Sequence, residues 1–312
     1  MYISFNNFLT LPFADFKGEL AALFAACLWA VSSVVYARIG ERIPPIELNL
    51  IKGAIAITLL VITLLLQGDF LVAIAPNNLC LLILSGVLGI GVGDTAFFFA
   101  LNYLGARRAL LMETLAPPIT AILALIFLQE TLSLLAICGI LLTVSGVAWV
   151  VTERVPNSQS RPTDLQRGIG FGIVAAIALA LGAVLSRAVL ATTSISPLWA
   201  ALLRLIGGVL ILLPWAWHRQ KPRDTKFYVS TLFSLKIICA VFFAAFAGTY
   251  LGIWLQQTAI KFTAAGIALT LTNTSPLFVI PIALCMGERV SNRAIFGVAV
   301  ALCGVALLLL LR

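Results

Sequence analysis

Charged residues are scarce in this 312-residue sequence. Only 10% of its positions carry Asp, Glu, Lys or Arg, whereas 62% are hydrophobic. A water-soluble fold of this size cannot hide so much apolar surface, so the composition excludes a soluble protein and places most of the chain in lipid. The net charge of +8 lies mainly in short gaps between apolar runs. It therefore indicates contact with anionic lipid head groups, and no nucleic-acid partner is expected.

Histidine is nearly absent as well, because His218 is the only one in the chain. The sequence has no H-E-x-x-H motif and no serine-lysine or paired-aspartate signature. The six cysteines all stand inside apolar runs without C-x-x-C spacing, which is typical of packing residues. We therefore expect no enzyme activity, no metal and no cofactor, and an intramembrane enzyme stays only as a distant alternative.

Apolar runs of about 20 residues, the length that crosses a bilayer as a helix, recur along the whole chain. They predict an all-α integral membrane protein with ten transmembrane helices. The expected spans are 18–37, 46–66, 79–101, 107–128, 133–151, 168–189, 197–217, 236–258, 264–284 and 292–311.

A stretch in the middle of the chain is repeated at an offset of 158 residues. In both copies an apolar helix with a proline near its start is followed by a short loop carrying one glutamate, and then by another apolar helix. The matched residues, expected to be structural, are Pro118 and Pro276, Glu130 and Glu288, Gly139 and Gly297, and Gly146 and Gly304.

The repeat divides the chain into two halves of five helices. We predict an interfacial tail at 1–17, a first repeat at 18–151, a linker at 152–167 and a second repeat at 168–312. Because five is odd, the second half must enter the membrane in the opposite orientation, which makes this a 5+5 inverted repeat. Fourteen basic residues lie at loops that follow odd-numbered helices (the odd-loop side), against four on the other side (the even-loop side). This charge bias predicts that the odd-loop side faces the cytoplasm and that both termini lie outside it.

Four ionisable residues fall inside predicted spans, namely Lys52, Asp94, Glu113 and Arg204. Charges within a membrane are costly, so each needs a partner or a watery cavity. Two interpretations stay open. One is a buried charge cluster that holds helices together, and the other is a direct role in binding substrate, gating or carrying protons.

Polar and aromatic residues at mid-membrane depth form the expected binding surface. Pro276 has no backbone N–H, so a backbone carbonyl one turn earlier lacks its usual donor. The hydroxyl and amide side chains of this segment either donate to that carbonyl or face a cavity. The candidates are Asn273, Thr270, Thr274, Trp254, Gln257, Tyr250, Trp29 and Phe98. The two loop glutamates are expected to act near helix starts, beside Ser133 and Ser291 as caps. The four glycines are expected to permit close helix packing away from the path.

The chain resembles the drug/metabolite transporter superfamily, in the branch with two EamA repeats. The resemblance rests on Trp29, on G-D-T-A-F-F-F-A-L-N-Y-L-G-A-R-R-A at 93–109, and on the spacing from proline to glutamate at Pro118–Glu130 and Pro276–Glu288. It implies secondary transport of small metabolites, often export of amino acids, through a central cavity. Many members are drawn with both termini in the cytoplasm, and smaller multidrug relatives carry a coupling glutamate in their first span. The loop charges here favour the reverse orientation, and no such glutamate is present.

Together these features predict an alternating-access transporter in the bacterial inner membrane that exports a small polar metabolite, such as an amino acid. Lys52 and Arg204 would hold anionic groups or lock gates. Because two buried cations suit phosphate, a carrier of phosphorylated metabolites or lipid-linked sugars is the alternative. The energy source stays open, as does assembly into a homodimer.

Overall fold

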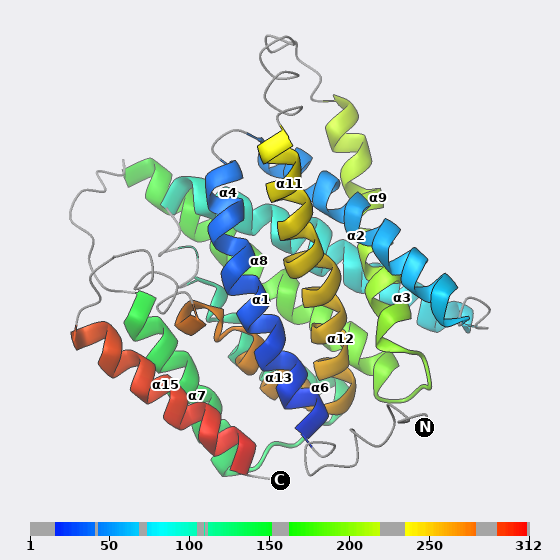
Figure 1. Cartoon of the computed structure of the whole chain (residues 1–312). Coiled ribbons are helices and arrows are strands. Elements are labelled where there is room, and N and C mark those ends of the chain that lie inside the picture. Colours follow the sequence, from blue (N-terminus) through cyan, green and yellow to red (C-terminus); the bar gives the residue numbers. More distant parts are fainter. Residues whose placement is uncertain are drawn as a thin grey trace, which may run out of the picture.

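The computed structural model describes residues 16–40, 43–68, 74–104, 109, 112–151, 162–218, 235–278 and 292–310. Every regular element in these ranges is helical, and the helices form one bundle (Figure 1). The first half contains α1 (Lys17–Gly40), α2 (Pro45–Gln67), α3 (Pro76–Gly86), η3 (Val87–Asp94), α4 (Thr95–Leu104), α6 (Ala116–Leu128) and α7 (Leu134–Val151). The second contains α8 (Pro162–Leu190), α9 (Pro197–His218), α11 (Leu235–Ala244), η4 (Ala245–Leu251), α12 (Gly252–Phe262), α13 (Ala265–Thr272) and α15 (Asn292–Leu310).

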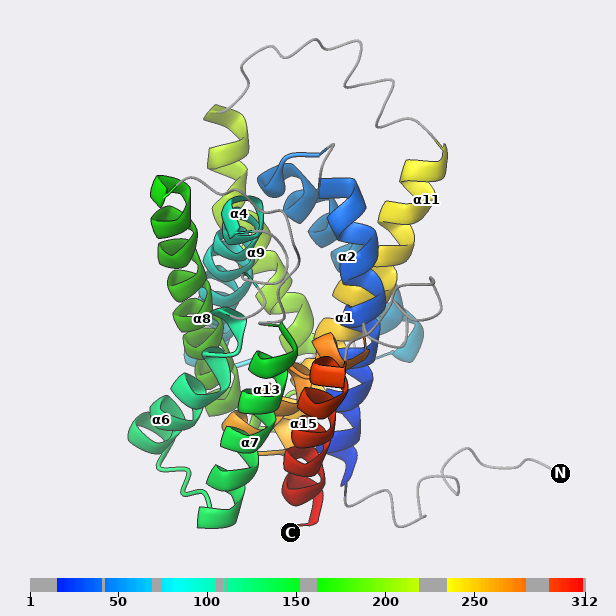
Figure 2. The ribbon, with the colours of Figure 1, turned by 90° about the vertical axis from the view of Figure 1, so that its left-hand side faces the viewer.

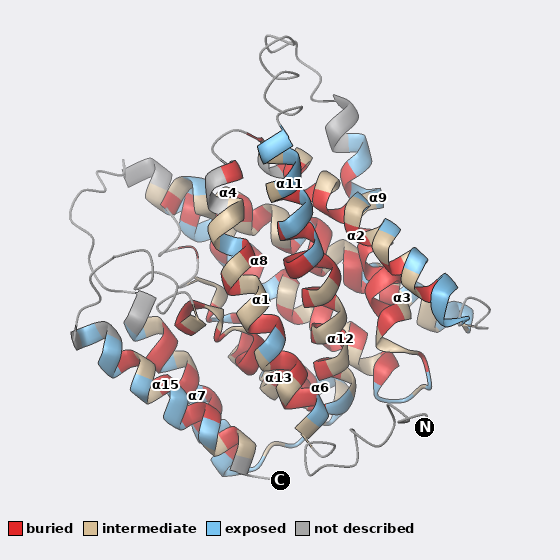
Figure 3. Cartoon of the chain, in the orientation of Figure 1, coloured by how far each residue is buried: buried red, intermediate tan, exposed pale blue. Residues whose placement is uncertain are grey.

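The expected fold class is confirmed: the protein is an all-α integral membrane protein with five helices in each half. Six of the described helical stretches are long and apolar enough to cross a bilayer, namely 17–36, 46–67, 76–104, 165–190, 197–214 and 235–262. Shorter apolar helices occupy 116–128, 134–149 and 295–309. Large apolar side chains are exposed on the outward faces of the bundle, where lipid is their solvent (Figure 3).

Proline sets several helix starts because its fixed φ suits the first helical turn, where its missing N–H is not needed. Helices α2, α3 and α9 begin at Pro45, Pro76 and Pro197. Helix α8 begins at Pro162, ahead of the predicted start at Gly168, so the end of the predicted linker is helical. The rest of that linker, 152–161, lies outside the described residues.

The third transmembrane helix of each half contains a π-helical segment. In the first half α3 continues through η3 into α4, and in the second α11 continues through η4 into α12. The segments start at Val87 and Ala245, which are 158 residues apart, the same offset as the sequence repeat. A π-helix often marks a functional site because its wider turn re-aims side chains. The repeat is therefore visible in backbone geometry as well as in sequence.

The fourth transmembrane helix of each half is interrupted. In the first half a turn at Thr114 and Leu115 precedes α6, and in the second a turn at Asn273 and Thr274 follows α13. Each break precedes a proline pair or single proline, as the sequence predicted. Such discontinuous helices carry polar backbone and side chains to mid-membrane depth, where they need protein or water as partners.

Helices α7 and α15 pack side by side at one edge of the bundle (Figures 1 and 2). A Cβ at Gly146 would lie 2.4 Å from the backbone nitrogen of Ala301, and one at Gly304 would lie 2.5 Å from that of Thr143. Only glycine permits this backbone approach. The predicted small-residue faces thus join the last helix of one half to the last helix of the other.

Candidate functional site

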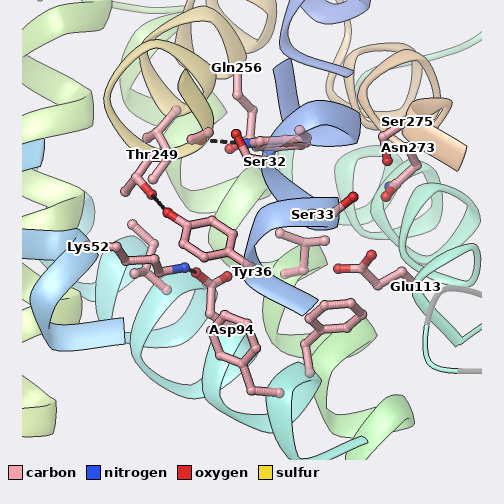
Figure 4. Close-up of a pocket in the computed structure, with 18 of the residues that line it drawn as sticks. Ser32, Ser33, Tyr36, Lys52, Asp94, Glu113, Thr249, Gln256, Asn273 and Ser275 are labelled. Atoms are coloured by element: carbon pink, nitrogen blue, oxygen red, sulfur yellow. Dashed lines mark hydrogen bonds and ion pairs between the residues drawn. The ribbon is translucent and has the colours of Figure 1, made fainter. Parts of the chain in front are cut away.

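A cavity of about 310 Å³ lies among the helices of both halves (Figure 4). Its walls come from α1, α2, the segment from η3 through α4, α8, α9, the segment from η4 through α12, and the two helix breaks. On α1 the lining runs from Trp29 to Tyr36, in the part of the helix that leads to the odd-loop side. The predicted site residues that line the cavity are Trp29, Lys52, Asp94, Phe98, Glu113, Arg204 and Asn273.

Lys52 and Asp94 form an ion pair in the wall of this cavity. The Lys52 Nζ donates to Asp94 Oδ2 at 2.6 Å, and the side chains are 8% and 30% exposed. The Lys52 Nζ also lies 5.0 Å from the ring centroid of Phe98, which allows a cation–π contact. The pair joins α2 to the end of η3, so it stabilises the bundle while Asp94 still reaches the cavity.

Arg204 on α9 crosses to α8 and η3. Its NH1 group donates to the Gly182 carbonyl at 3.1 Å, and the residue is 2% exposed. A Cβ at Gly89 would lie 2.9 Å from Arg204 NH2, so glycine leaves room for the guanidinium. Arg204 and Lys52 border one cavity, because the second-half helix α9 packs against α2, α3 and η3.

Glu113 and Asn273 come from the two helix breaks. Glu113 makes no hydrogen bond or ion pair with any residue that the structure describes. Figure 4 shows its carboxylate directed into the cavity, with Ser33, Asn273 and Ser275 around the same space. The Ser33 hydroxyl donates to the Ala30 carbonyl at 2.9 Å, which leaves its lone pairs free to accept.

Aromatic side chains form the apolar walls. The Trp29 Nε1 donates to the Gly248 carbonyl in η4 at 2.7 Å, which fixes the indole against the cavity. The hydroxyls of Tyr36 and Thr249 lie 3.1 Å apart and join α1 to η4. Phe97 and Phe98 add apolar surface from α4. The cavity therefore combines aromatic walls with a few polar groups, as small-molecule sites commonly do.

Three predicted site residues of the eighth transmembrane helix lie outside the cavity lining. The Tyr250 hydroxyl lies 2.8 Å from that of Thr63 and so faces α2. Trp254 packs beside Tyr250 in an apolar cluster with α2 and α9. Gln257 is fully buried and accepts a hydrogen bond from Ser186. The π-helical turn and the packing of α12 against α1 and α9 set this rotation, which the sequence does not show.

Two further predicted residues also lie outside the lining. Their side-chain hydroxyls donate to backbone carbonyls of their own segment. The Thr270 hydroxyl donates to Gly266 and the Thr274 hydroxyl to Leu271, at 2.7 and 2.6 Å. This is the usual way in which a helical threonine is satisfied in an apolar setting. Of the polar residues before Pro276, Asn273 and Ser275 line the cavity, which is fewer than their number in the sequence suggested.

Tyr36 and Thr249 belong to the lining but were missed as site residues. A signal for Tyr36 was present, since Trp29, Ser32, Ser33 and Tyr36 recur every three or four residues on one face of α1. No sequence signal marks Thr249. It reaches the cavity because η4 places it there.

Glu130 has a different structural role from the one expected. Its Oε1 accepts from Arg187 Nε at 2.5 Å, and its Oε2 accepts from the Ala265 backbone N–H at 3.0 Å. Glu130 thus caps α13 of the second half, whereas Ser133 caps the helix that follows, by accepting from the Ala136 N–H at 3.1 Å. Its repeat mate Glu288, with Ser291, lies outside the described residues.

Arg187 completes a contact between the two halves at their even-loop ends. Its NH1 donates to the Ile260 and Lys261 carbonyls at 2.8 and 2.7 Å. The Lys261 Nζ in turn donates to the Ile195 carbonyl at 2.7 Å. We call Glu130, Arg187 and Lys261 the even-face network. No sequence signal marks this role of Arg187, because Glu130 lies 57 positions away in the chain.

Comparison with known proteins agrees with this architecture. The family model of the EamA-like transporter family matches the chain twice, at residues 16–152 and 166–310. Among solved structures 29 chains match. One crystal structure superposes with a TM-score of 0.76 at 17% identity, over 94% of this chain and 96% of that one. At this identity the likeness shows the fold alone. No curated protein matches the chain.

Proposed function

The chain belongs to the EamA-like transporter family of small-molecule membrane transporters, and we propose that it moves a small polar organic metabolite, such as an amino acid, by alternating access. The cavity carries this proposal. It lies between helices of both halves and receives side chains from both helix breaks. Inverted-repeat transporters bind their substrates at such a position and expose the site by rocking one half against the other.

The cavity has the size and chemistry for a small metabolite. Its volume of about 310 Å³ is at the lower end of the usual range for ligand pockets. The polar groups Glu113, Ser33 and Asn273 face it together with the Trp29 and Phe98 rings. A compound with one polar end and an apolar body would match both kinds of surface.

Export is the direction that the arrangement supports. The cavity lining lies toward the odd-loop ends of α1 and α4, whereas the even-face network ties the halves together at the other ends. The loop charges favour an odd-loop side in the cytoplasm. Taken together, these features let the cavity take its substrate from the cytoplasm of a bacterial cell.

A carrier of phosphorylated metabolites or lipid-linked sugars is less well supported. That function would use the Lys52 and Arg204 cations for the phosphate. Lys52 is paired with Asp94, and Arg204 donates to the Gly182 carbonyl while it is almost fully buried. Phosphate binding would have to displace Asp94 from Lys52 and reach a guanidinium that is almost fully buried.

Counterflow in proteoliposomes tests the proposal. Vesicles are loaded with pooled amino acids or with pooled phosphorylated metabolites, and uptake of labelled members of each pool is followed. Accumulation with the amino-acid pool that is lost in Lys52→Ala supports the proposed function. Accumulation with the phosphate pool alone would replace it by the alternative.

A further inference from the structure

We propose that Glu113 binds a positively charged amine of the substrate, so that the transported compounds are amines with an apolar body. This inference rests on the proposed function and defines its substrate class. It follows from which charged groups of the cavity already have partners.

Each strong hydrogen-bond donor group of the cavity makes at least one bond within the protein. The Lys52 ammonium donates to Asp94, the Arg204 guanidinium to the Gly182 carbonyl, and the Trp29 indole to the Gly248 carbonyl. An anionic ligand would therefore have to displace Asp94 from Lys52 or reach Arg204, whose Nε has no described partner but which is only 2% exposed. Breaking a buried pair is costly, because it leaves one charge without compensation.

The acceptors of the cavity are in the opposite situation. Glu113 has no hydrogen-bond or ion-pair partner among the described residues, and its carboxylate points into the cavity (Figure 4). An ionised carboxylate can only accept hydrogen bonds, and leaving it unpaired at membrane depth is expensive. A ligand ammonium relieves that cost directly. Among the four charged residues of the lining, Glu113 is thus the one without a described partner, and a ligand cation can supply that partner.

The groups around Glu113 fit the remaining needs of an ammonium, which has three N–H donors. The Ser33 hydroxyl has used its hydrogen toward Ala30, so only its acceptor lone pairs remain. The side-chain carbonyl of Asn273 lies on the same side of the cavity. Carboxylate, hydroxyl and amide oxygens together can accept from one ammonium group.

The rest of the cavity determines what the amine is attached to. The Trp29 and Phe98 rings, with Phe97 and Ile253, form apolar walls. The Asn273 and Gln256 amides keep neutral donors that tolerate a carboxylate on the same compound. Zwitterionic amino acids and simple amines therefore both belong to the class. The positive charge is required, and the negative one is dispensable.

Two matched series of compounds test this assignment by removing one charge at a time. Leucine is compared with 3-methylbutylamine, 4-methylpentanoate and 3-methylbutanol, and phenylalanine with phenethylamine, 3-phenylpropionate and 2-phenylethanol. Binding to the purified full chain in detergent is followed by tryptophan fluorescence, because Trp29 lines the cavity. We expect the amine and the amino acid of a series to bind, and the acid and the alcohol to bind at least about tenfold more weakly.

The variants identify the residue. Glu113→Gln weakens amine binding by about tenfold or more, whereas Glu113→Asp keeps the preference for amines. Glu47→Gln is the matched control, since this carboxylate in the first turn of α2 is outside the cavity lining. Size-exclusion profiles show whether each variant folds, and if Glu113→Gln does not, the comparison of each amine with its acid and its alcohol in the wild type carries the test.

The proposal is overturned if either acid binds more tightly than its amine, or if no compound binds the wild type at about 10 mM. It is also overturned if a folded Glu113→Gln keeps amine affinity within about twofold of wild type. Counterflow of the same compounds separates the two proposals. Amines that bind through Glu113 but do not exchange contradict the transport function alone. Exchange that persists in Glu113→Gln contradicts the amine site alone.

Discussion

The even-face network allows a sharp prediction, because Arg187 connects three separate segments. In Arg187→Gln the guanidinium is lost, so the Glu130 carboxylate keeps the Ala265 N–H as its remaining described donor, and the Ile260 and Lys261 carbonyls lose theirs. Removing one partner of a buried ion pair costs about 3–5 kcal/mol. The two side chains are 16% and 18% exposed, so we expect the lower end, about 3 kcal/mol.

The partner variant should cost less. In Glu130→Gln the amide oxygen can still accept from one donor, and Arg187 keeps both of its carbonyl acceptors. We expect a loss of about 1.5 kcal/mol, and a double variant that costs about 1–2 kcal/mol less than the sum of the single variants. This coupling is the signature of a direct contact between the halves.

Thermal unfolding of the purified protein in detergent measures these effects. At about 2 °C per kcal/mol for a chain of this size, Arg187→Gln lowers the apparent Tm by about 6 °C. Arg293→Gln is the control, because Arg293 is exposed and its interaction among the described residues is a cation–π contact with the Trp149 ring, and it should change the Tm by about 1 °C or less. Single variants within about 1 °C of wild type, or strictly additive effects, would refute the network.

Three further predictions test the fold and the cavity. Gly86→Ala places a Cβ 1.9 Å from the Arg204 carbonyl oxygen, so we expect a loss of about 2–3 kcal/mol in thermal unfolding, whereas Gly170→Ala meets nothing within 4 Å and should be neutral or slightly stabilising. Asp94→Asn should lower the Tm more than Lys52→Met, because it leaves the Lys52 ammonium unpaired at 8% exposure, whereas Lys52→Met leaves the Asp94 carboxylate unpaired at 30% exposure. The reverse order would show that Asp94 has another role. Tyr250→Phe removes the contact with Thr63 and should cost about 1 kcal/mol of stability, yet counterflow should stay within about twofold of wild type because Tyr250 is outside the cavity lining.

Some site residues could be identified without the structure, for one physical reason. An ionisable group inside the membrane needs a partner or a cavity. The sequence therefore marked Lys52, Asp94, Glu113 and Arg204 as site candidates whatever their positions in the bundle. All four border one cavity. Composition and spacing cannot tell which of them are paired, because pairing depends on atoms that meet across different helices.

The direction in which a helix faces was much less predictable. Tyr250 and Thr249 are neighbours, yet Thr249 lines the cavity and Tyr250 contacts α2. Successive helical residues point about 100° apart, and a π-helical turn changes that angle locally. The rotation of η4 is set by its packing against α1 and α2. A list of polar residues at the right depth therefore includes both.

The amino-acid sequence alone determined the membrane environment, the all-helical class and the two opposed five-helix halves, because each follows from local apolar runs, prolines and an offset that is counted along the chain. Only the tertiary structure decided that Lys52 pairs with Asp94, that Arg187 joins Glu130 to α12, and that Glu113 is left facing the cavity. These contacts join residues at least 40 positions apart, and their free energy depends on distances that packing sets. No local pattern records those distances.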